Sequence, residues 1–322
     1  MARGILTTIR HLAAAAALTV GLLPSVARAQ DSLASFTWPD HPFARTLPDA
    51  LFVDTGEARF QKAGRALAQS WGGIGAELGQ IATFPLSDPA TFGAFALGVG
   101  ALTLVDKPTT VLYQKTFLPV GEKFNLPRLV QVRGLTIDAQ YLALGVAGTY
   151  AYGLAANDER AQVAALLATK AVAYSYLTSH LILKTAFGRV RPVQDLDGHT
   201  GPTGDYTTSP FEFFRSTGVH FDTHPYATGM PSFHFTMYFS TARVYSGVYD
   251  NYVIPYGIAA ALALQSAEGH NHWVSDMVAG ALIGTGIGNV ILSNYEDRRG
   301  VSAMVTPIAS SKGVGLGLQM SF

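Results

Sequence analysis

Apolar residues recur along this chain in stretches of helical length, separated by short polar or proline-rich segments. Their length and low proline content predict helices over residues 58–71, 87–105, 138–155, 159–187, 232–249, 252–266 and 275–293. Ser87-Asp88-Pro89 supplies an N-cap and a first-turn proline for the second of these helices. Consecutive helices pack as a bundle, so the predicted fold class is all-α.

Two segments depart from this helical pattern. Every second residue from Val314 to Phe322 is apolar, which is the period of a strand. Residues 301–322 are therefore expected to form a short C-terminal β-hairpin. Residues 30–56 are punctuated by prolines and are predicted to be an irregular arm that lies on the body of the protein.

The first 29 residues have the pattern of an export signal. Arg3 and Arg10 precede an apolar run over residues 12–26, and Ala27-Arg28-Ala29 is a small-x-small cleavage site. The pattern predicts a signal peptide over residues 1–29 and a mature chain on the periplasmic side of the cell envelope. A retained membrane anchor is the alternative. The chain has no cysteine, so its stability is expected to come from packing and not from disulfides.

Charge and composition narrow the choice of partners. Lys and Arg number 22, as do Asp and Glu, so no bulk charge attracts nucleic acid. Charged residues are 14% of the chain, against about 25% in a typical soluble domain, and this shortfall indicates lipid contact. Most apolar runs are shorter than the roughly 20 residues of a spanning helix. The chain is expected to be membrane-embedded or membrane-associated, with a tightly packed soluble bundle as the alternative.

Three short blocks carry candidate chemistry, and the first contains two cations. Lys184 ends a predicted helix, and Arg191 lies beyond Gly188 where Pro192 prevents further helix. Both cations can converge on one anion, Arg191 as a planar fork and Lys184 as a point charge. The alternative is that they only complement the dipole of the helix C-terminus.

The second and third blocks contain histidines at helix starts. Ser232 and the free amides of a helix first turn form an anion site, and His234 is placed to act as a general acid. Asp276, four residues after His272, can fix the imidazole tautomer and leave the other nitrogen free to attack phosphorus. The alternatives are an ordinary serine cap and a structural His-Asp hydrogen bond.

In this order the blocks resemble the signature of the type 2 phosphatidic acid phosphatase superfamily, K-x6-RP, PSGH and SR-x5-H-x3-D. The matching residues are Lys184-x6-Arg191-Pro192 in full, Pro231-Ser232-Phe233-His234 in three positions of four, and His272-x3-Asp276 at the end of the third motif. The resemblance covers roughly residues 160–293. We therefore expect a domain of this kind over residues 136–300, preceded by an arm and accessory helices over residues 30–135.

The resemblance implies a helical bundle of the phosphatase and haloperoxidase kind and a metal-independent phosphatase without a cofactor. His272 would form a phosphohistidine, Asp276 would orient it, and His234 would protonate the leaving group and then activate water. The phosphate-binding groups would be Lys184, Arg191, Ser232 and the backbone amide of Phe233. The implied substrate is a phosphomonoester or diphosphate, either a phosphorylated lipid or a small phosphoester.

Two departures from the signature bear on this expectation. Phe233 replaces a glycine and changes the shape of the pocket, because glycine allows close backbone approach to a ligand. Ser266 stands where the signature has Arg, which removes one phosphate-binding cation. His270, Arg189 and Arg215 are the candidates to replace it.

The polar segment between the first two blocks carries further histidines and aromatic residues. His220-x-Asp222-x-His224 has the spacing of a metal site, but no second cluster accompanies it, so no metal is expected. We interpret the segment as a lid, with Phe211, Phe213 and Phe214 contacting a substrate tail.

Two other functions compete with a phosphatase. Phe233 and Ser266 favour a non-catalytic envelope protein of the same fold that binds phospholipid head groups. A vanadate-dependent haloperoxidase is disfavoured by the missing Arg, since a resident oxyanion needs permanent charge.

Overall fold

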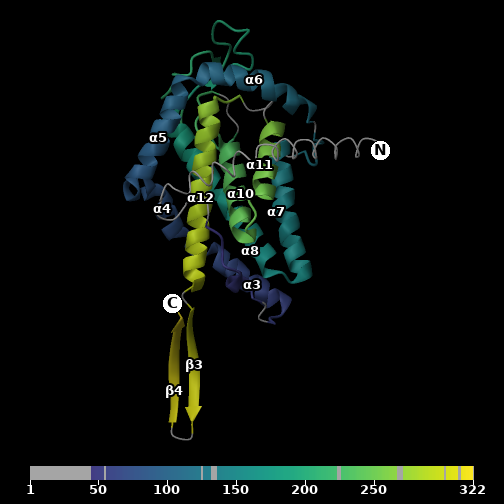
Figure 1. The fold of residues 1–322 in the computed structure, drawn as a ribbon, viewed down its shortest axis with the longest axis vertical. Coiled ribbons are helices and arrows are strands. Elements are labelled where there is room, and N and C mark those ends of the chain that lie inside the picture. Colours follow the sequence, from purple (N-terminus) through teal and green to yellow (C-terminus); the bar gives the residue numbers. More distant parts are fainter. Residues whose placement is uncertain are drawn as a thin grey trace, which may run out of the picture.

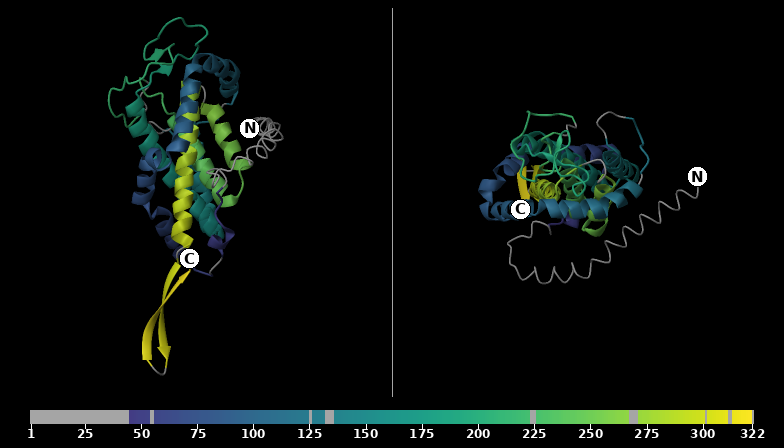
Figure 2. Two further views of the ribbon diagram at one scale, coloured as in Figure 1. Left: turned by 60° about the vertical axis from the view of Figure 1, so that its left-hand side comes forward. Right: turned by 90° about the horizontal axis from the view of Figure 1, so that it is seen from above.

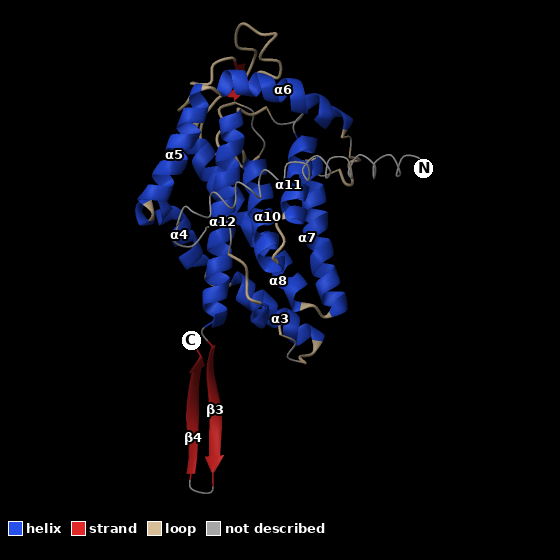
Figure 3. Ribbon diagram, in the orientation of Figure 1, coloured by secondary structure: helices blue, strands red, loops and turns tan. Residues whose placement is uncertain are grey.

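The computed structural model describes residues 45–53, 56–124, 126–131, 136–222, 226–266, 271–300, 302–310 and 313–321. The predicted signal peptide lies outside these residues. Helices form the body of the protein, and a two-stranded hairpin extends from one end of it (Figures 1 and 3). The expected all-α bundle with a C-terminal β-hairpin is therefore confirmed.

The regular elements follow the chain in this order. The helices are η1 (Asp49–Phe52), α3 (Arg59–Trp71), α4 (Ile74–Ser87), α5 (Pro89–Leu104), α6 (Asp106–Lys123), α7 (Ile137–Ala156), α8 (Glu159–Ser175), the π-helical segment η2 (Tyr176–Leu183), α9 (Lys184–Phe187), α10 (Phe233–Tyr249), α11 (Val253–Ser266) and α12 (Val274–Gly300). The strands are β1 (Arg191–Pro192), β2 (Tyr206–Thr207), β3 (Ser302–Ser310) and β4 (Gly313–Ser321). β1 and β2 are parallel, and β3 and β4 form the antiparallel hairpin.

The core lies between α8, α10 and α12. Thirteen of the 17 residues of α8 are buried, because its small Ala side chains allow neighbours on every side. A buried ion pair joins this core to α4: Lys170 of α8 contacts Glu77 at 2.8 Å, and both side chains are fully inaccessible. Tyr174 and Arg298 also donate to Glu77, so α4, α8 and α12 share one satisfied carboxylate.

A row of glycines on α12 lets α10 approach its backbone. Gly280, Gly284 and Gly288 recur every fourth residue, so they lie on one face of the helix. A β-carbon at Gly284 would clash with the carbonyl oxygen of Thr236, and one at Gly280 would clash with that of Ser232. The two helices therefore meet backbone to backbone, which brings the N-terminus of α10 beside that of α12.

The chain bends sharply between α5 and α6. The two helices meet at 76°, so α6 lies across the end of the bundle at which α12 begins (Figure 1). The loops of residues 189–222 gather at the same end (Figure 2). Gln114 of α6 fixes this loop, because its side chain donates to the carbonyl of Val193 and accepts from the amide of Leu196.

Two helices, α4 and α6, were not predicted from the sequence. Both contain prolines, at Pro85 in α4 and at Pro108 and Pro119 in α6. Pro108 lies in the first turn of α6. An N–H group in that turn would have no intrahelical hydrogen-bond acceptor, so proline is tolerated there. The predicted helix over residues 159–187 is continuous but contains η2, and the last predicted helix extends seven residues further, to Gly300.

The described residues contain one helix long and apolar enough to cross a bilayer, Val274–Arg299. More than half of its apolar window is buried inside the protein, as in the core helix of a soluble bundle. The bent pair α5 and α6 passes the same test only when taken as one broken span.

The glycine row gives a stability prediction. We expect Gly284→Ala to lower the free energy of unfolding by about 1–3 kcal/mol, because the added β-carbon must push the helices apart. Gly286→Ala is the matched control, since a β-carbon there meets no neighbouring atom. Denaturant unfolding of both variants checks this, and equal stabilities would contradict it.

Candidate active site

His272 and Asp276 form a buried pair at the start of α12. His272 Nδ1 lies 3.5 Å from Asp276 Oδ2, and the side chains are 2% and 0% exposed. The same oxygen accepts the backbone N–H of Trp273 at 3.0 Å, and the Trp273 indole donates to the carbonyl of Val190. The expected dyad is thus present, with a fixed carboxylate on the Nδ1 side of the imidazole.

The first block supplies two buried cations. The π-helical segment η2 leads directly into Lys184, and Gly188, at a φ of 47°, ends α9 and turns the chain toward Arg191. Lys184 and Arg191 are 5% and 6% exposed. Arg191 donates to the hydroxyl of Thr228 at 3.0 Å. Its Nε has no partner among the described residues, and no described acceptor bonds to the Lys184 ammonium.

The second block meets the third through a backbone hydrogen bond. The Ser232 N–H donates to the Asp276 carbonyl at 2.9 Å, while the fully buried Ser232 hydroxyl has no partner among the described residues. His234 Nε2 lies 3.4 Å from the Thr136 hydroxyl and 3.7 Å from Asp138 Oδ2. The close approach of Ser232 to Asp276 follows from the glycine row on α12.

Arg191 and Lys184 share an electrostatic environment with the dyad. Gly229 lies between Arg191 and Asp276. A β-carbon at Gly229 would be 3.1 Å from Asp276 Oδ2 and 3.6 Å from Arg191 Cγ. Burial and the neighbouring Arg191 charge lower the pKa of Lys184 well below its usual value, and Asp276 partly opposes this. Burial also lowers the pKa of Arg191. A bound anion would stabilise both charged forms.

A sequence comparison decides the relationship that this geometry suggests. The family model described as the PAP2 superfamily matches residues 162–299. Residues 162–299 are thus similar in sequence to the PAP2 superfamily. No curated protein and no solved structure matches the chain. The expected resemblance is thereby confirmed, and all three blocks lie inside the matched residues.

The cation that PAP2 proteins carry near the third motif has no replacement among the candidates that the structure describes. Ser266 is buried and donates to the carbonyl of Ala263. Arg189 is occupied by Asp276 and Asp106, and Arg215 is exposed on the loop. His270 lies outside the described residues. Arg189 is therefore part of the dyad's surroundings and not a phosphate clamp.

Phe233, the second departure from the PAP2 signature, packs its ring into an aromatic cluster. Its centroid lies 5.8 Å from that of Tyr176 and 5.4 Å from that of His180, both edge-on. The cluster joins the start of α10 to the π-helical segment. Phe233 thus replaces the flexibility of glycine by a fixed contact on one wall of the site.

His180 was not singled out from the sequence, although it precedes Lys184 by one helical turn. It lines a small pocket together with Lys184 and Thr228. Burial and the charges of Lys184 and Arg191 lower its pKa to about 4, so it is neutral at pH 7. Neither ring nitrogen makes a hydrogen bond within the described chain. A neutral imidazole beside two cations can donate one hydrogen bond to a phosphate oxygen.

The aromatic residues and histidines of the loop lie in different surroundings. Phe211 and Phe214 are exposed, whereas the Phe213 ring lies 4.7 Å from the Arg189 guanidinium carbon. His220 lies 2.8 Å from the Thr217 hydroxyl. His224 lies outside the described residues, and the described part of the chain contains no cluster of three metal-ligating side chains.

Lys184 gives a ligand-binding prediction. At a concentration of a hundred times its Kd, bound phosphate should raise the free energy of unfolding of the wild type by about 2.7 kcal/mol and so raise its Tm. We expect Lys184→Met to abolish this rise in Tm. Without phosphate the variant should be more stable than the wild type, because an unpaired buried ammonium is removed. Thermal unfolding with and without phosphate measures both effects.

Lys115→Met is the matched control, because Lys115 is exposed and pairs with Asp197 at the surface. It should keep the phosphate-induced shift. A shift of wild-type size in Lys184→Met would show that phosphate binds elsewhere.

Proposed function

We propose that this protein is a metal-independent phosphatase that hydrolyses a phosphomonoester or diphosphate, with a lipid phosphate as the natural substrate. The observation that supports this most directly is a set of buried donors without partners around the dyad. They are the Arg191 Nε and the Ser232 hydroxyl, and the side chain of Lys184, which is 5% exposed, adds a cation beside them. Unsatisfied buried polar groups are costly, and a phosphate would satisfy all three.

The proposed reaction begins at His272. Asp276 holds the Nδ1 side of the ring, so Nε2 is the nitrogen that attacks phosphorus and forms the phosphohistidine. The P–O bond to the leaving group breaks, and His234 gives its proton to that oxygen. His234 then removes a proton from water, which attacks phosphorus and releases phosphate and free His272. Asp276 supports the positive charge on His272 while the phosphoenzyme exists.

In the proposed site, the cations that would balance the negative charge of a phosphate, Lys184 and Arg191, lie on one side only. Lys184 is the first residue of α9, and Arg191 belongs to the strand that follows it. Ser266, in contrast, lies near Tyr238, whose hydroxyl donates to Asp138. Losing one charge-assisted contact to a transition state costs about 100-fold in rate. We therefore propose a slower enzyme than a PAP2 protein that carries the Arg.

The surface of α5 supports a membrane location for the proposed enzyme. No charged residue occurs from Pro89 to Leu104, and among its side chains only Thr103 is buried. Leu97 and Leu104 are 76% and 72% exposed. A helix that is apolar all round and has most of its side chains exposed or only half-buried suits lipid. We propose that α5 contacts the membrane on the periplasmic side of the envelope.

The first test is hydrolysis by the purified mature protein. We expect release of phosphate from phosphatidic acid, a polyprenyl diphosphate or an aryl phosphate in the presence of chelator. His272→Ala should lower kcat at least about 1,000-fold, because the nucleophile is lost. His199→Ala, which removes an exposed loop histidine, is the control and should retain activity.

Two outcomes would contradict the mechanism. Activity that survives His272→Ala, or that requires added metal, rules out the phosphohistidine pathway. Phosphate or phospholipid binding without turnover of any substrate would favour the second candidate, a non-catalytic head-group-binding protein. Phe233 and Ser266 are the residues that favour that candidate.

The membrane proposal has a test of its own. The wild-type protein should remain in the membrane fraction during detergent-free washing and be released by detergent. Leu97→Glu combined with Leu104→Glu should move a larger fraction into the wash, because two charges in lipid are costly. Phe60→Glu on α3, equally exposed at 83%, is the control. Equal extraction of all three proteins would contradict lipid contact by α5.

A further inference from the structure

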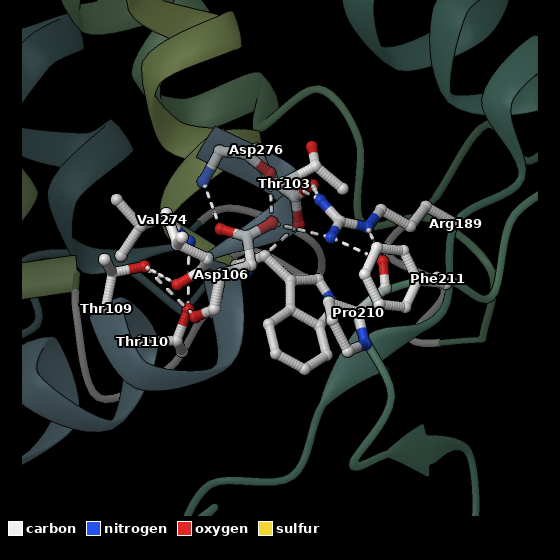
Figure 4. Close-up of polar contacts among 12 residues, drawn as sticks. Thr103, Asp106, Thr109, Thr110, Arg189, Pro210, Phe211, Val274 and Asp276 are labelled. Carbon is white, nitrogen blue, oxygen red and sulfur yellow. Dashed lines mark hydrogen bonds and ion pairs between the residues drawn. The ribbon is translucent and has the colours of Figure 1, made fainter. Parts of the chain in front are cut away.

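The N-terminus of α12 is capped by side chains of α6. Asp106 Oδ1 accepts the backbone N–H of Ser275 at 2.9 Å, and its Oδ2 accepts the Ser275 hydroxyl. One turn later in α6, the Thr110 hydroxyl accepts the backbone N–H of Val274 at 3.1 Å. Two otherwise free amides of α12 are thus satisfied from a helix that lies outside the PAP2-matched residues (Figure 4).

Arg189 connects Asp106 to the dyad. Its Nη2 donates to Asp106 Oδ2 and its Nη1 to Asp276 Oδ1, both at 2.7 Å, and all three side chains are fully buried (Figure 4). The Ser275 hydroxyl and the Pro210 carbonyl accept the remaining guanidinium hydrogen bonds. The planar guanidinium therefore fixes the distance between the two carboxylates.

Aromatic rings hold the guanidinium in place. The Arg189 carbon lies 4.7 Å from the centre of the Phe213 ring and 5.3 Å from that of Trp273. These contacts favour a cation and exclude water. Since all three charged side chains are fully buried, solvent and salt screen their interactions less than they screen pairs at the surface.

The charge balance of this chain of groups decides how Asp276 acts on His272. With two carboxylates and one guanidinium, one negative charge remains for the imidazole. If Asp106 were neutral, Arg189 would be paired with Asp276 alone, and the pair would carry no net charge. Lys184 and Arg191, the other charged groups that act on Asp276, are cations and would oppose a protonated His272 further.

We propose that Asp106 is a positioning residue for the proposed reaction, which holds Arg189 and the start of α12 so that Asp276 stays anionic and aligned with His272. This rests on the proposed roles of His272 and Asp276. It also assigns a role to the accessory N-terminal helices, which the PAP2 match does not include.

The test is Asp106→Asn, which keeps the shape of the side chain and removes its charge. We expect kcat to fall about 10- to 100-fold with KM within twofold of the wild type, since the substrate contacts remain. The acid limb of the kcat/KM profile should move to lower pH, because a protonated His272 loses support. Asp197→Asn removes the same charge from an exposed pair with Lys115 and should change neither quantity.

A readout independent of turnover separates this proposal from the proposed function. In ¹⁵N-histidine-labelled protein, with the His272 signal assigned by its loss in His272→Gln, the titration of His272 should move to lower pH in Asp106→Asn. This holds even if the wild type hydrolyses no substrate. An unchanged His272 titration together with an unchanged acid limb would overturn the proposal.

Asp106→Glu separates charge from position and replaces Asp106→Asn if that variant does not fold. The longer side chain keeps the charge but displaces Arg189, so kcat should fall while the acid limb stays in place. A wild-type kcat in Asp106→Glu would show that the position of the carboxylate does not matter and would overturn the proposal.

Discussion

Backbone contact between α10 and α12 brings together groups that lie some forty residues apart in sequence. The glycine row on α12 permits this contact, and its immediate consequence is the hydrogen bond from the Ser232 amide to the Asp276 carbonyl. That single bond fixes the second block against the third. Any side chain that separated the helices would move His234 and the Ser232 hydroxyl away from the dyad, even with every residue of the signature present.

The charges of the site are arranged unevenly around the dyad. Lys184 and Arg191, which form no ion pair among the described residues, lie on one side, whereas Arg189 is paired with Asp276. A resting protein with two unpaired buried cations is less stable than one in which they are paired. In the proposed enzyme, binding of a phosphate would relieve this cost and would in this way add to the affinity for the substrate. The cost in stability of burying unpaired cations limits how many of them the site can contain. With Ser266 in place of Arg, the site contains one cation fewer than the signature would supply.

The sequence predicted most of the helices, though not α4 and α6, and all three blocks, because these depend on local spacing. Lys184, Arg191, Ser232, His272 and Asp276 were found by their types and intervals, and the structure brings them together. Asp106 could not be found in this way, because nothing in its neighbourhood marks a partner 170 residues later. Likewise, Arg189 lies two residues before Arg191, and only the fold shows that one binds carboxylates while the other keeps a free nitrogen. The pattern of apolar residues also does not reveal the π-helical segment, which places His180 beside Lys184.

The bend between α5 and α6 joins the exposed apolar surface to the dyad. Asp106 is the first residue of α6, directly after the bend, and α5 on the other side of it carries Leu97 and Leu104 on its surface. A displacement of α5 would therefore act on Asp106 before any other polar group, and through Arg189 on Asp276. The proposed lipid contact of α5 and the proposed alignment of His272 would in this way be linked by one short segment. The contacts of Asp106 with Arg189 and Ser275 therefore join α6 to the PAP2-matched residues in space as well as along the chain.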